Sequence, residues 1–243
     1  MGTISVRDHI KWGTDDPSEP TSTLVLTSPS RWFVDIRVLK TALPVPTDAR
    51  HVVLSDLTDN QLDWAFGGTS STSQLTRENG THVSHSTFRH WVDSRTTSPE
   101  EVVDEGDMFE QPSGLTLETG HMVNPATGYD TEYEELWRDE QPQPVPGLAK
   151  CIVLRAHDDA NETRGLFVCL GQYAQGVIRR GHIFTAERWI WNSSDSKWER
   201  QLRWGTHSTP TLRDLVCSLG KTYEKNDRVE TSSGTWTVIE KVD

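Results

Sequence analysis

Short runs of alternating apolar and polar residues, divided by polar turns, recur along most of the chain. In the clearest run Trp32, Val34 and Ile36 share one parity, and Asp35 and Arg37 share the other. Alternation with a period of two is typical of a strand that has one buried face. We therefore expect Asp35 and Arg37 to lie on the solvent side of this strand.

The same alternation predicts strands in both halves of the chain. Leu62, Trp64 and Phe66 alternate in one of them, and we expect Gly67 and Gly68, with the Thr/Ser run that follows, to end it. The other predicted strands lie near residues 24–26, 88–92, 115–117, 129–137, 151–156, 165–178, 184–191, 198–204 and 236–242.

One helix is predicted, over residues 210–219. Leu212, Leu215 and Leu219 recur at helical spacing, and Gly220 follows them as a stop signal. Such a helix has one apolar face to bury. We expect it to cover an open end of the second sheet.

A proline-rich segment divides the chain. Three prolines within residues 142–146 remove backbone donors and favour extended backbone. The parts on either side share the pattern of short strands, although neither is an evident copy of the other. We predict a first domain at residues 1–140, a linker at 141–147 and a second domain at 148–243.

Composition supports a mainly β fold. The 243 residues include 28 Thr and 20 Val but 9 Ala, a bias towards residues that favour strands over helices. An antiparallel sheet of five or more strands with one apolar face closes into a barrel or packs as a sandwich. Two small antiparallel β-barrels, with one short helix in the second, fit the length and the pattern.

Charge and hydropathy exclude several classes of partner. The 24 Lys and Arg stand against 36 Asp and Glu, a formal charge of −12, so we expect no binding of nucleic acid. No run of 18 apolar residues and no signal-like N-terminal run occurs, so we expect a soluble intracellular protein without membrane insertion. The three cysteines form no CxxC pair and predict free thiols rather than a disulfide or metal site.

No catalytic motif is present. The chain lacks a G-x-S-x-G elbow, a P-loop, a G-x-G-x-x-G fingerprint and an H-E-x-x-H pair, so we assign no catalytic residue, cofactor or metal. His82 and His90 would lie about 26 Å apart along one strand, too far to share a metal ion. A cofactor-free isomerase or cyclase remains an alternative, with Asp63, His90 and Glu187 as candidate acid/base groups.

Aromatic side chains are the candidate ligand-binding residues. Barrel interiors either fill with side chains or leave room for one small ligand, so these rings form either a packed core or a pocket for a small apolar molecule. The candidates are Trp32, Trp64, Phe66 and Trp91 in the first barrel, and Tyr173, Trp189, Trp191, Trp198, Trp204 and Trp236 in the second.

Several blocks, in order through both halves, carry a resemblance to a known family. They are Asp63–Thr69, Trp91–Asp93, Leu136–Trp137, Ala149–Leu154, Gly165–Val168, Gly171–Gly176 and Gly234–Glu240. In their order and spacing the chain resembles a fungal family of small intracellular proteins, first noticed as interactors of a casein-kinase-1 homologue. The blocks cover nearly the whole chain.

The resemblance implies a fold and a kind of function. The fold is two lipocalin-like β-barrels, and the function is binding to a casein-kinase-1-type kinase and to other proteins, with no established enzymatic activity. It implies a cytoplasmic location and leaves the nucleus open as a second one. Tyr173 stands where the family often has Trp, which keeps an aromatic ring but adds a hydroxyl that needs a partner.

Overall fold

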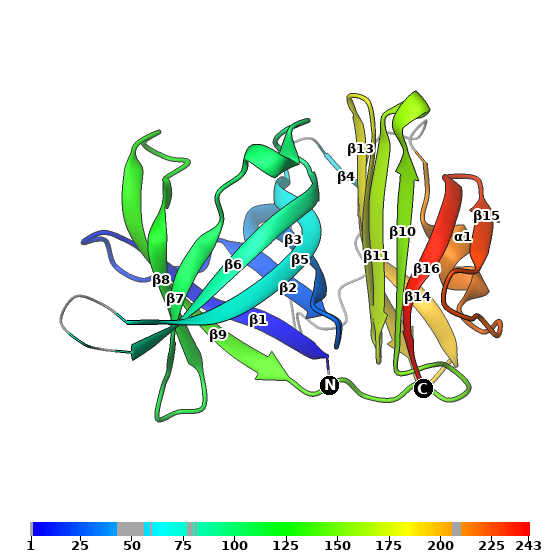
Figure 1. Cartoon of the computed structure of the whole chain (residues 1–243), viewed down its shortest axis with the longest axis horizontal. Helices are drawn as coiled ribbons and strands as arrows, with labels where there is room; N and C mark the ends of the chain where they lie inside the picture. Colours follow the sequence, from blue (N-terminus) through cyan, green and yellow to red (C-terminus); the bar gives the residue numbers. More distant parts are fainter. Residues whose placement is uncertain (1, 43–55, 59, 77–79, 81, 206–209) are drawn as a thin grey trace.

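The chain forms two antiparallel sheets that lie side by side (Figure 1). The computed structural model describes residues 2–42, 56–58, 60–76, 80, 82–205 and 210–243. One sheet is a closed barrel, the other is an open half-barrel, and one short α-helix covers the latter. The predicted mainly β fold with two barrel-like sheets and one helix is confirmed.

The first barrel has eight strands and closes where β1 pairs with β9. Each neighbouring pair is antiparallel, so short turns suffice to connect most of them. The strands are β1 (Thr3–Trp12), β2 (Thr21–Thr27), β3 (Trp32–Leu39), β5 (Leu62–Thr76), β6 (His82–Asp93), β7 (Glu105–Glu110), β8 (Thr116–Val123) and β9 (Asp130–Glu140). Two 3₁₀ turns, η1 (Lys40–Ala42) and η3 (Pro99–Glu101), flank them.

The half-barrel runs in the order β15-β16-β10-β11-β12-β13-β14-β4 and does not close. Its last strand, β4 (Asp56–Leu57), comes from the first half of the chain and pairs in parallel with β14. The others are β10 (Cys151–Asp158), β11 (Thr163–Leu170), β12 (Tyr173–Arg180), β13 (Ile183–Asn192), β14 (Lys197–Trp204), β15 (Arg228–Thr231) and β16 (Gly234–Val242), with η4 (Asp159–Asn161) between β10 and β11.

Helix α1 (Arg213–Ser218) covers the face of the half-barrel that the strands of a closed barrel would enclose. It is shorter than predicted, but Leu212, Leu215 and Leu219 are buried as the pattern requires. They pack in one cluster with Phe167 and Trp236. Because the helix buries this face, the half-barrel gains an apolar core without closing.

The opposite face of the half-barrel packs against the outside of the first barrel. Val34 and Ile36 of β3 share one apolar cluster with Val153, Leu166 and Val168 of β10 and β11, and all five are fully buried. Figure 1 shows the second sheet standing between the closed barrel and α1. The two sheets therefore share a core.

The prediction that Asp35 and Arg37 face solvent is wrong. Asp35 is 2% exposed and Arg37 is 7% exposed, because their face of β3 points into the closed barrel. The apolar face of β3, which the alternation marked as the core side, lies outside the barrel and is covered by the half-barrel. Both faces of this strand are buried.

The prediction that Gly67 and Gly68 end a strand is also wrong, since β5 continues to Thr76. The register between β5 and β6 shifts between these two glycines, as in a β-bulge. A Cβ atom on Gly68 would lie 1.8 Å from the carbonyl oxygen of Arg89. The glycine is therefore needed for close approach of two strands, not for a stop.

A buried polar link joins the two sheets. Gln175 Nε2 donates to the carbonyl oxygens of Leu24 (3.0 Å) and Val34 (3.1 Å). Arg188 donates from Nε to Gln175 Oε1 (2.6 Å) and from Nη2 to the carbonyl of Ile36 (2.8 Å). Burial lowers the pKa of Arg188 to about 10, so it stays charged at neutral pH and depends on these acceptors.

We expect the two sheets to unfold in one transition, because their core is common to both. Replacing Gln175→Leu removes two hydrogen bonds and the acceptor of the buried Arg188, so the free energy of unfolding should fall by about 2–4 kcal/mol. Urea denaturation followed by fluorescence and circular dichroism measures this change. The exposed Gln74→Leu is the control, with a change within about 0.5 kcal/mol. Two separate transitions in the unmodified protein would contradict the shared core.

Candidate functional sites

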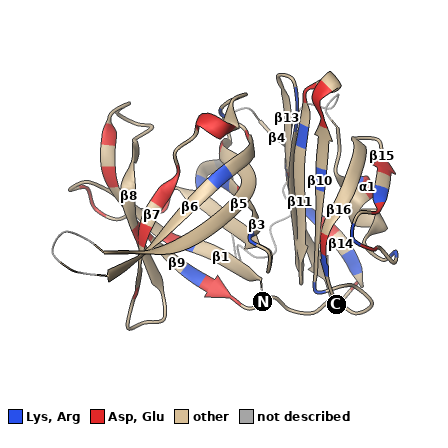
Figure 2. Ribbon diagram, in the orientation of Figure 1, with Lys and Arg blue, Asp and Glu red and all other residues tan. Residues whose placement is uncertain are grey.

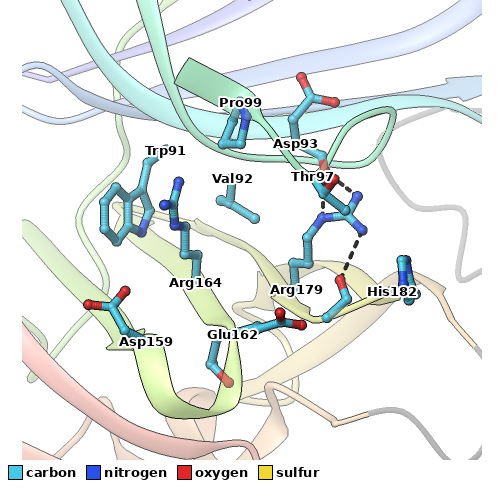
Figure 3. A pocket seen from close by; sticks show the side chains of 12 residues that line it. Trp91, Val92, Asp93, Thr97, Pro99, Asp159, Glu162, Arg164, Arg179 and His182 are labelled. Carbon is cyan, nitrogen blue, oxygen red and sulfur yellow. Dashed lines mark hydrogen bonds between the residues drawn. The ribbon is translucent and has the colours of Figure 1, made fainter. Parts of the chain in front are cut away.

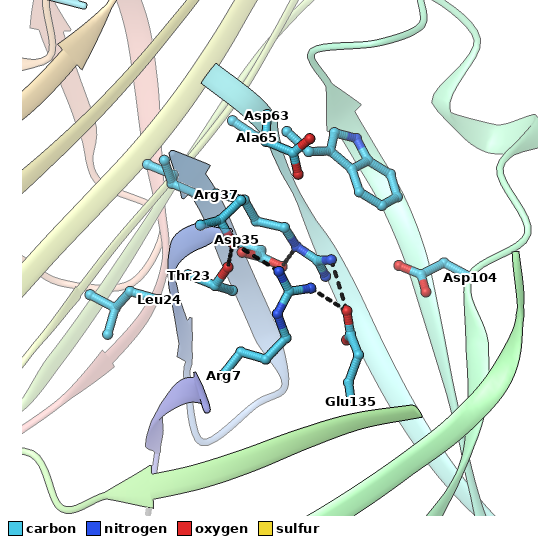
Figure 4. Close-up of polar contacts among 12 residues, drawn as sticks. Arg7, Thr23, Leu24, Asp35, Arg37, Asp63, Ala65, Asp104 and Glu135 are labelled. Atoms are coloured by element: carbon cyan, nitrogen blue, oxygen red, sulfur yellow. Dashed lines mark hydrogen bonds and ion pairs between the residues drawn. The ribbon is translucent and has the colours of Figure 1, made fainter. Parts of the chain in front are cut away.

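A chain of ion pairs crosses the interior of the first barrel (Figure 4). Arg37 of β3 donates to Asp35 (2.9 Å) and to Glu135 of β9 (3.2 Å). Arg7 of β1 also contacts Glu135, and its Nε lies 2.9 Å from Glu19. The network thus links three strands through charged side chains that are almost completely buried.

The opposite charges in this network stabilise one another's ionised forms. Burial disfavours the charged form of Arg37, but Asp35 and Glu135 outweigh burial and raise its pKa well above the usual value. Burial raises the pKa of Asp35, against the effect of Arg37. Removing one partner would leave an uncompensated charge inside the barrel, which is strongly destabilising.

A second polar cluster surrounds His90 on β6. Its Nδ1 lies 2.7 Å from Asp93, its Nε2 lies 3.0 Å from Asp104, and its ring stacks on Phe66 with centroids 4.3 Å apart. Burial opposes the imidazolium form, but the hydrogen bonds to Asp104 and Asp93 outweigh it and raise the pKa of His90. Trp64 Nε1 donates to Asp93 as well (3.0 Å).

Glu118 of β8 is a buried carboxyl group with a strongly raised pKa. Burial, and then the charges of Glu135 and Asp104, raise its pKa to about 8. Its oxygens lie 3.0 Å from the hydroxyl of Tyr133 and 3.0 Å from Nε1 of Trp137. The group therefore keeps its proton at neutral pH. It lines an interior cavity of only about 40 Å³.

The mouth of the first barrel is a depression of about 250 Å³. Trp64 lies there between two cations, with the Arg95 guanidinium 4.4 Å and the Arg37 guanidinium 5.3 Å from its ring. Arg95 pairs with Asp63 at 3.1 Å. The charged and aromatic side chains at the mouth thus contact one another.

A pocket of about 370 Å³ lies at the seam between the two sheets (Figure 3). Arg179 donates to the backbone carbonyl of Asp93 (3.1 Å), and the Arg164 guanidinium lies 5.0 Å from the ring of Trp91. Glu162 and His182 also line the pocket. Within the described part of the chain, the buried Nε1 of Trp91 has no hydrogen-bond partner.

A wide groove of about 1080 Å³ opens between α1 and the hairpin of β13 and β14. Trp191 and Trp198 form an edge-to-face pair there, with centroids 5.7 Å apart, and both remain partly exposed. Leu148 and Val216 extend the apolar floor. Lys197, Arg200 and Arg213 add basic side chains to its lining.

The predicted aromatic residues do not converge on one site. Only Trp64 and Phe66 lie in the interior of the first barrel, where they pack with Phe33. Trp189 and Trp236 belong to the core under α1. Four others pack in or against the core shared by the two sheets: Trp32, Trp91, Tyr173 and Trp204. The last two, Trp191 and Trp198, line a groove beside α1.

The candidate acid/base groups are also apart. Asp63 lies at the barrel mouth, and His90 lies inside the barrel. Glu187 lies within the half-barrel, where it accepts from Trp189 Nε1 (2.9 Å) and Arg203 Nε (3.2 Å). The sequence offered no signal that could bring these residues together.

Among the described residues, no group of three His, Cys, Asp or Glu side chains could hold a metal ion. The three cysteines are free, with Cys151 and Cys169 buried and Cys217 exposed. No helix in the described ranges is long and apolar enough to span a membrane.

Comparison with known proteins places the chain in a family. The family model described as Protein HRI1 matches residues 3–240. The chain belongs to the HRI1 family. A crystal structure of an uncharacterised protein, YLR301w from Saccharomyces cerevisiae, has the same fold with a TM-score of 0.71 and 21% sequence identity, and the match covers all of both chains. No curated protein matches the sequence.

The HRI1 match spans both sheets, so the closed barrel and the half-barrel belong to one family unit. The identity of 21% to the solved structure supports the fold alone. Sequence reasoning missed the interior charges of this HRI1 protein, above all Arg7, Glu118 and Glu135. The charged residues of β9 and the single acidic residue of β8, Glu118, are visible in the sequence, but they do not reveal which face closes inwards.

Stability should fall with rising pH because of Glu118. The folded protein keeps this proton to about pH 8, whereas the ordinary pKa is 4.5, so the unfolded chain binds fewer protons between these values. The loss is on the order of 4 kcal/mol across this range. Glu118→Gln should remove most of that loss and be more stable than the unmodified protein at pH 9. Urea denaturation at pH 5, 7 and 9 measures the difference.

The exposed Glu132→Gln is the matched control and should follow the unmodified protein at each pH. The raised pKa of His90 lowers stability in the same direction as pH rises, but His90 is present in all three proteins. Parallel pH profiles for the Glu118→Gln and unmodified proteins would contradict a protonated Glu118.

Proposed function

We propose that this protein acts by binding other proteins and has no enzymatic activity. The observation that carries this proposal is the open groove of about 1080 Å³ beside α1, with the Trp191–Trp198 pair on its floor. Tryptophan and arginine are enriched in protein interfaces and dominate their binding energy. We propose a casein-kinase-1-type kinase as one partner, which is what the family resemblance implies, in the cytoplasm and also in the nucleus.

Carriage of a small apolar molecule has less support. Ligand pockets usually measure about 300–1,000 Å³ and are mostly apolar. The interior cavity of the first barrel is about 40 Å³, and Asp35, Arg37 and Glu118 line it. The half-barrel is filled by the residues around α1. The predicted aromatic residues act mainly as core under this proposal.

A cofactor-free enzyme also has little support. Glu118 is a perturbed acid of the kind found in active sites. Its cavity is too small for a substrate, however, and His90 nearby is held by two carboxylates. We therefore regard both polar clusters as structural parts of the barrel.

Binding to a purified casein-kinase-1-type kinase tests the proposal. We expect a complex in biolayer interferometry, and we expect Trp191→Ala to weaken it at least tenfold because it removes half of the aromatic pair. Trp12→Ala is the control, since this partly exposed tryptophan packs edge-on against Tyr133 in the first barrel. Absence of a complex at protein concentrations of about 50 μM would count against the kinase as a partner. A dissociation constant well above this value would be too high for a specific transient complex.

Native mass spectrometry tests the carrier alternative. The full chain, purified without delipidation, should show the mass of the polypeptide alone, because the interior of the barrel is occupied by its own side chains. A retained apolar molecule that dissociates only on unfolding would contradict the proposed role and favour carriage.

A further inference from the structure

The charge of the chain is divided unequally between its two parts. Residues 1–140 contain 10 Lys and Arg against 24 Asp and Glu, a formal charge of −14, and residues 141–243 contain 14 against 12, a formal charge of +2. Figure 2 shows acidic positions along β7, β8 and β9 and basic positions on the strands of the half-barrel. Anionic partners are therefore favoured on the half-barrel.

Three arginines of the half-barrel line the place where β10 and β16 separate. The ladder between these strands ends at Ala156 and Trp236, although β10 continues to Asp158 and β16 begins at Gly234. A depression of about 380 Å³ lies at this separation. It is lined by Arg155, Arg180 and Arg228, by Thr163, Thr235, Thr237 and Gly234, and by His157 and Asp158.

Arg155 and Arg180 are held in place by aromatic rings, a hydroxyl and a carbonyl, and hydrogen bonds from Asn161 together with the charge of Arg180 lower the pKa of Asp158. Arg155 lies over the rings of Trp91 (5.2 Å) and Trp32 (5.9 Å). Arg180 donates to the Thr163 hydroxyl (3.3 Å) and to the carbonyl of Ser233 (3.1 Å). Neither of these two arginines forms an ion pair with a carboxylate of the described residues.

The acidic groups near the depression have other partners. Asp158 accepts from the backbone and side-chain nitrogens of Asn161 (3.2 and 2.7 Å). Asp159 lies 2.8 Å from His157. Glu230 accepts from the Thr235 hydroxyl and lies 3.9 Å from Arg228, with both side chains about 70% exposed. Such an exposed pair contributes little.

We propose that this depression binds a phosphate monoester carried on a serine or threonine of a partner protein. Three guanidinium groups and neighbouring hydroxyls match a dianion with three terminal oxygens better than a single carboxylate, which one arginine satisfies. Thr163 lines both this depression and the seam pocket of about 370 Å³. The seam pocket therefore offers space for the residues of the partner that flank the phosphorylated one. The phosphate site is inferred from the depression itself. The choice of a protein segment as the carrier of the phosphate rests on the proposed role in protein binding.

An NMR titration of the ¹⁵N-labelled full chain tests the inference. The probes are the peptide acetyl-Gly-phosphoserine-Gly-amide, its unphosphorylated form and inorganic phosphate, at constant ionic strength. The phosphopeptide should give saturable shifts at the amides of Gly234 and Thr235, and the unphosphorylated peptide should give none. Arg155→Gln and Arg180→Gln should each weaken binding about tenfold, since each removes a charge-assisted hydrogen bond.

Two further variants keep the test decisive. Arg228→Gln changes a side chain that is 72% exposed, so it should weaken binding without affecting the fold. Arg89→Gln makes the same charge change on the first barrel and should leave binding unchanged. Absence of saturable shifts, equal shifts with the unphosphorylated peptide, or unchanged binding in the three depression variants would overturn the inference.

Comparison with inorganic phosphate distinguishes a protein segment from a small anion. The phosphopeptide should bind more tightly, and equal affinity would overturn the choice of a protein segment. This test is independent of the groove at the opposite end of the half-barrel. Loss of the kinase complex in Trp191→Ala concerns the groove alone, and missing phosphopeptide shifts would overturn this inference whatever the kinase does.

Discussion

Burial of the outer face of β2 and β3 under the half-barrel is the contact on which the rest of the structure depends. Val34 and Ile36 meet Leu166 and Val168 there, and Gln175 adds hydrogen bonds to the carbonyls of the first barrel. A sheet covered on one face by a barrel and on the other by a helix needs no further strands to close it. The open edge, and with it the tryptophan groove, is thus a consequence of this packing.

The same contact accounts for the polar interior of the first barrel. Because Val34 and Ile36 of β3 point outwards to the half-barrel, Asp35 and Arg37 point inwards, where Arg37 contacts Asp35 and Glu135. Buried ion pairs add little net stability compared with apolar packing, but each partner is required once the other is present. The network fills the barrel and fixes the mutual positions of β1, β3 and β9. Binding is then left to the outer surfaces.

The sequence predicted the helix and most of the strands, because period-two and helical spacing depend on neighbouring residues. It missed β1, β4, β7 and β15, and the range 165–178 holds two strands, β11 and β12. It could not predict the direction of the β3 faces. Alternation shows that Asp35 and Ile36 face opposite ways, but not that a second sheet covers the apolar side. The raised pKa of Glu118 was likewise out of reach, since it depends on Glu135 and on closure of the barrel. Gly67 and Gly68 predict the end of a strand because a bulge and a turn share the same composition, and the structure has a bulge there.

The distribution of charge connects the acidic composition with binding on the half-barrel. A formal charge of −12 opposes anionic partners at long range, but salt limits this effect to about 8 Å under physiological conditions. At the separation of β10 and β16 the local charge comes from Arg155 and Arg180, whose partners are rings, hydroxyls and a carbonyl. The acidic first barrel instead repels an anionic partner that approaches it, since like charges make encounter less frequent. Net charge and local binding therefore act together, and an acidic protein can present a cationic site on its less acidic part.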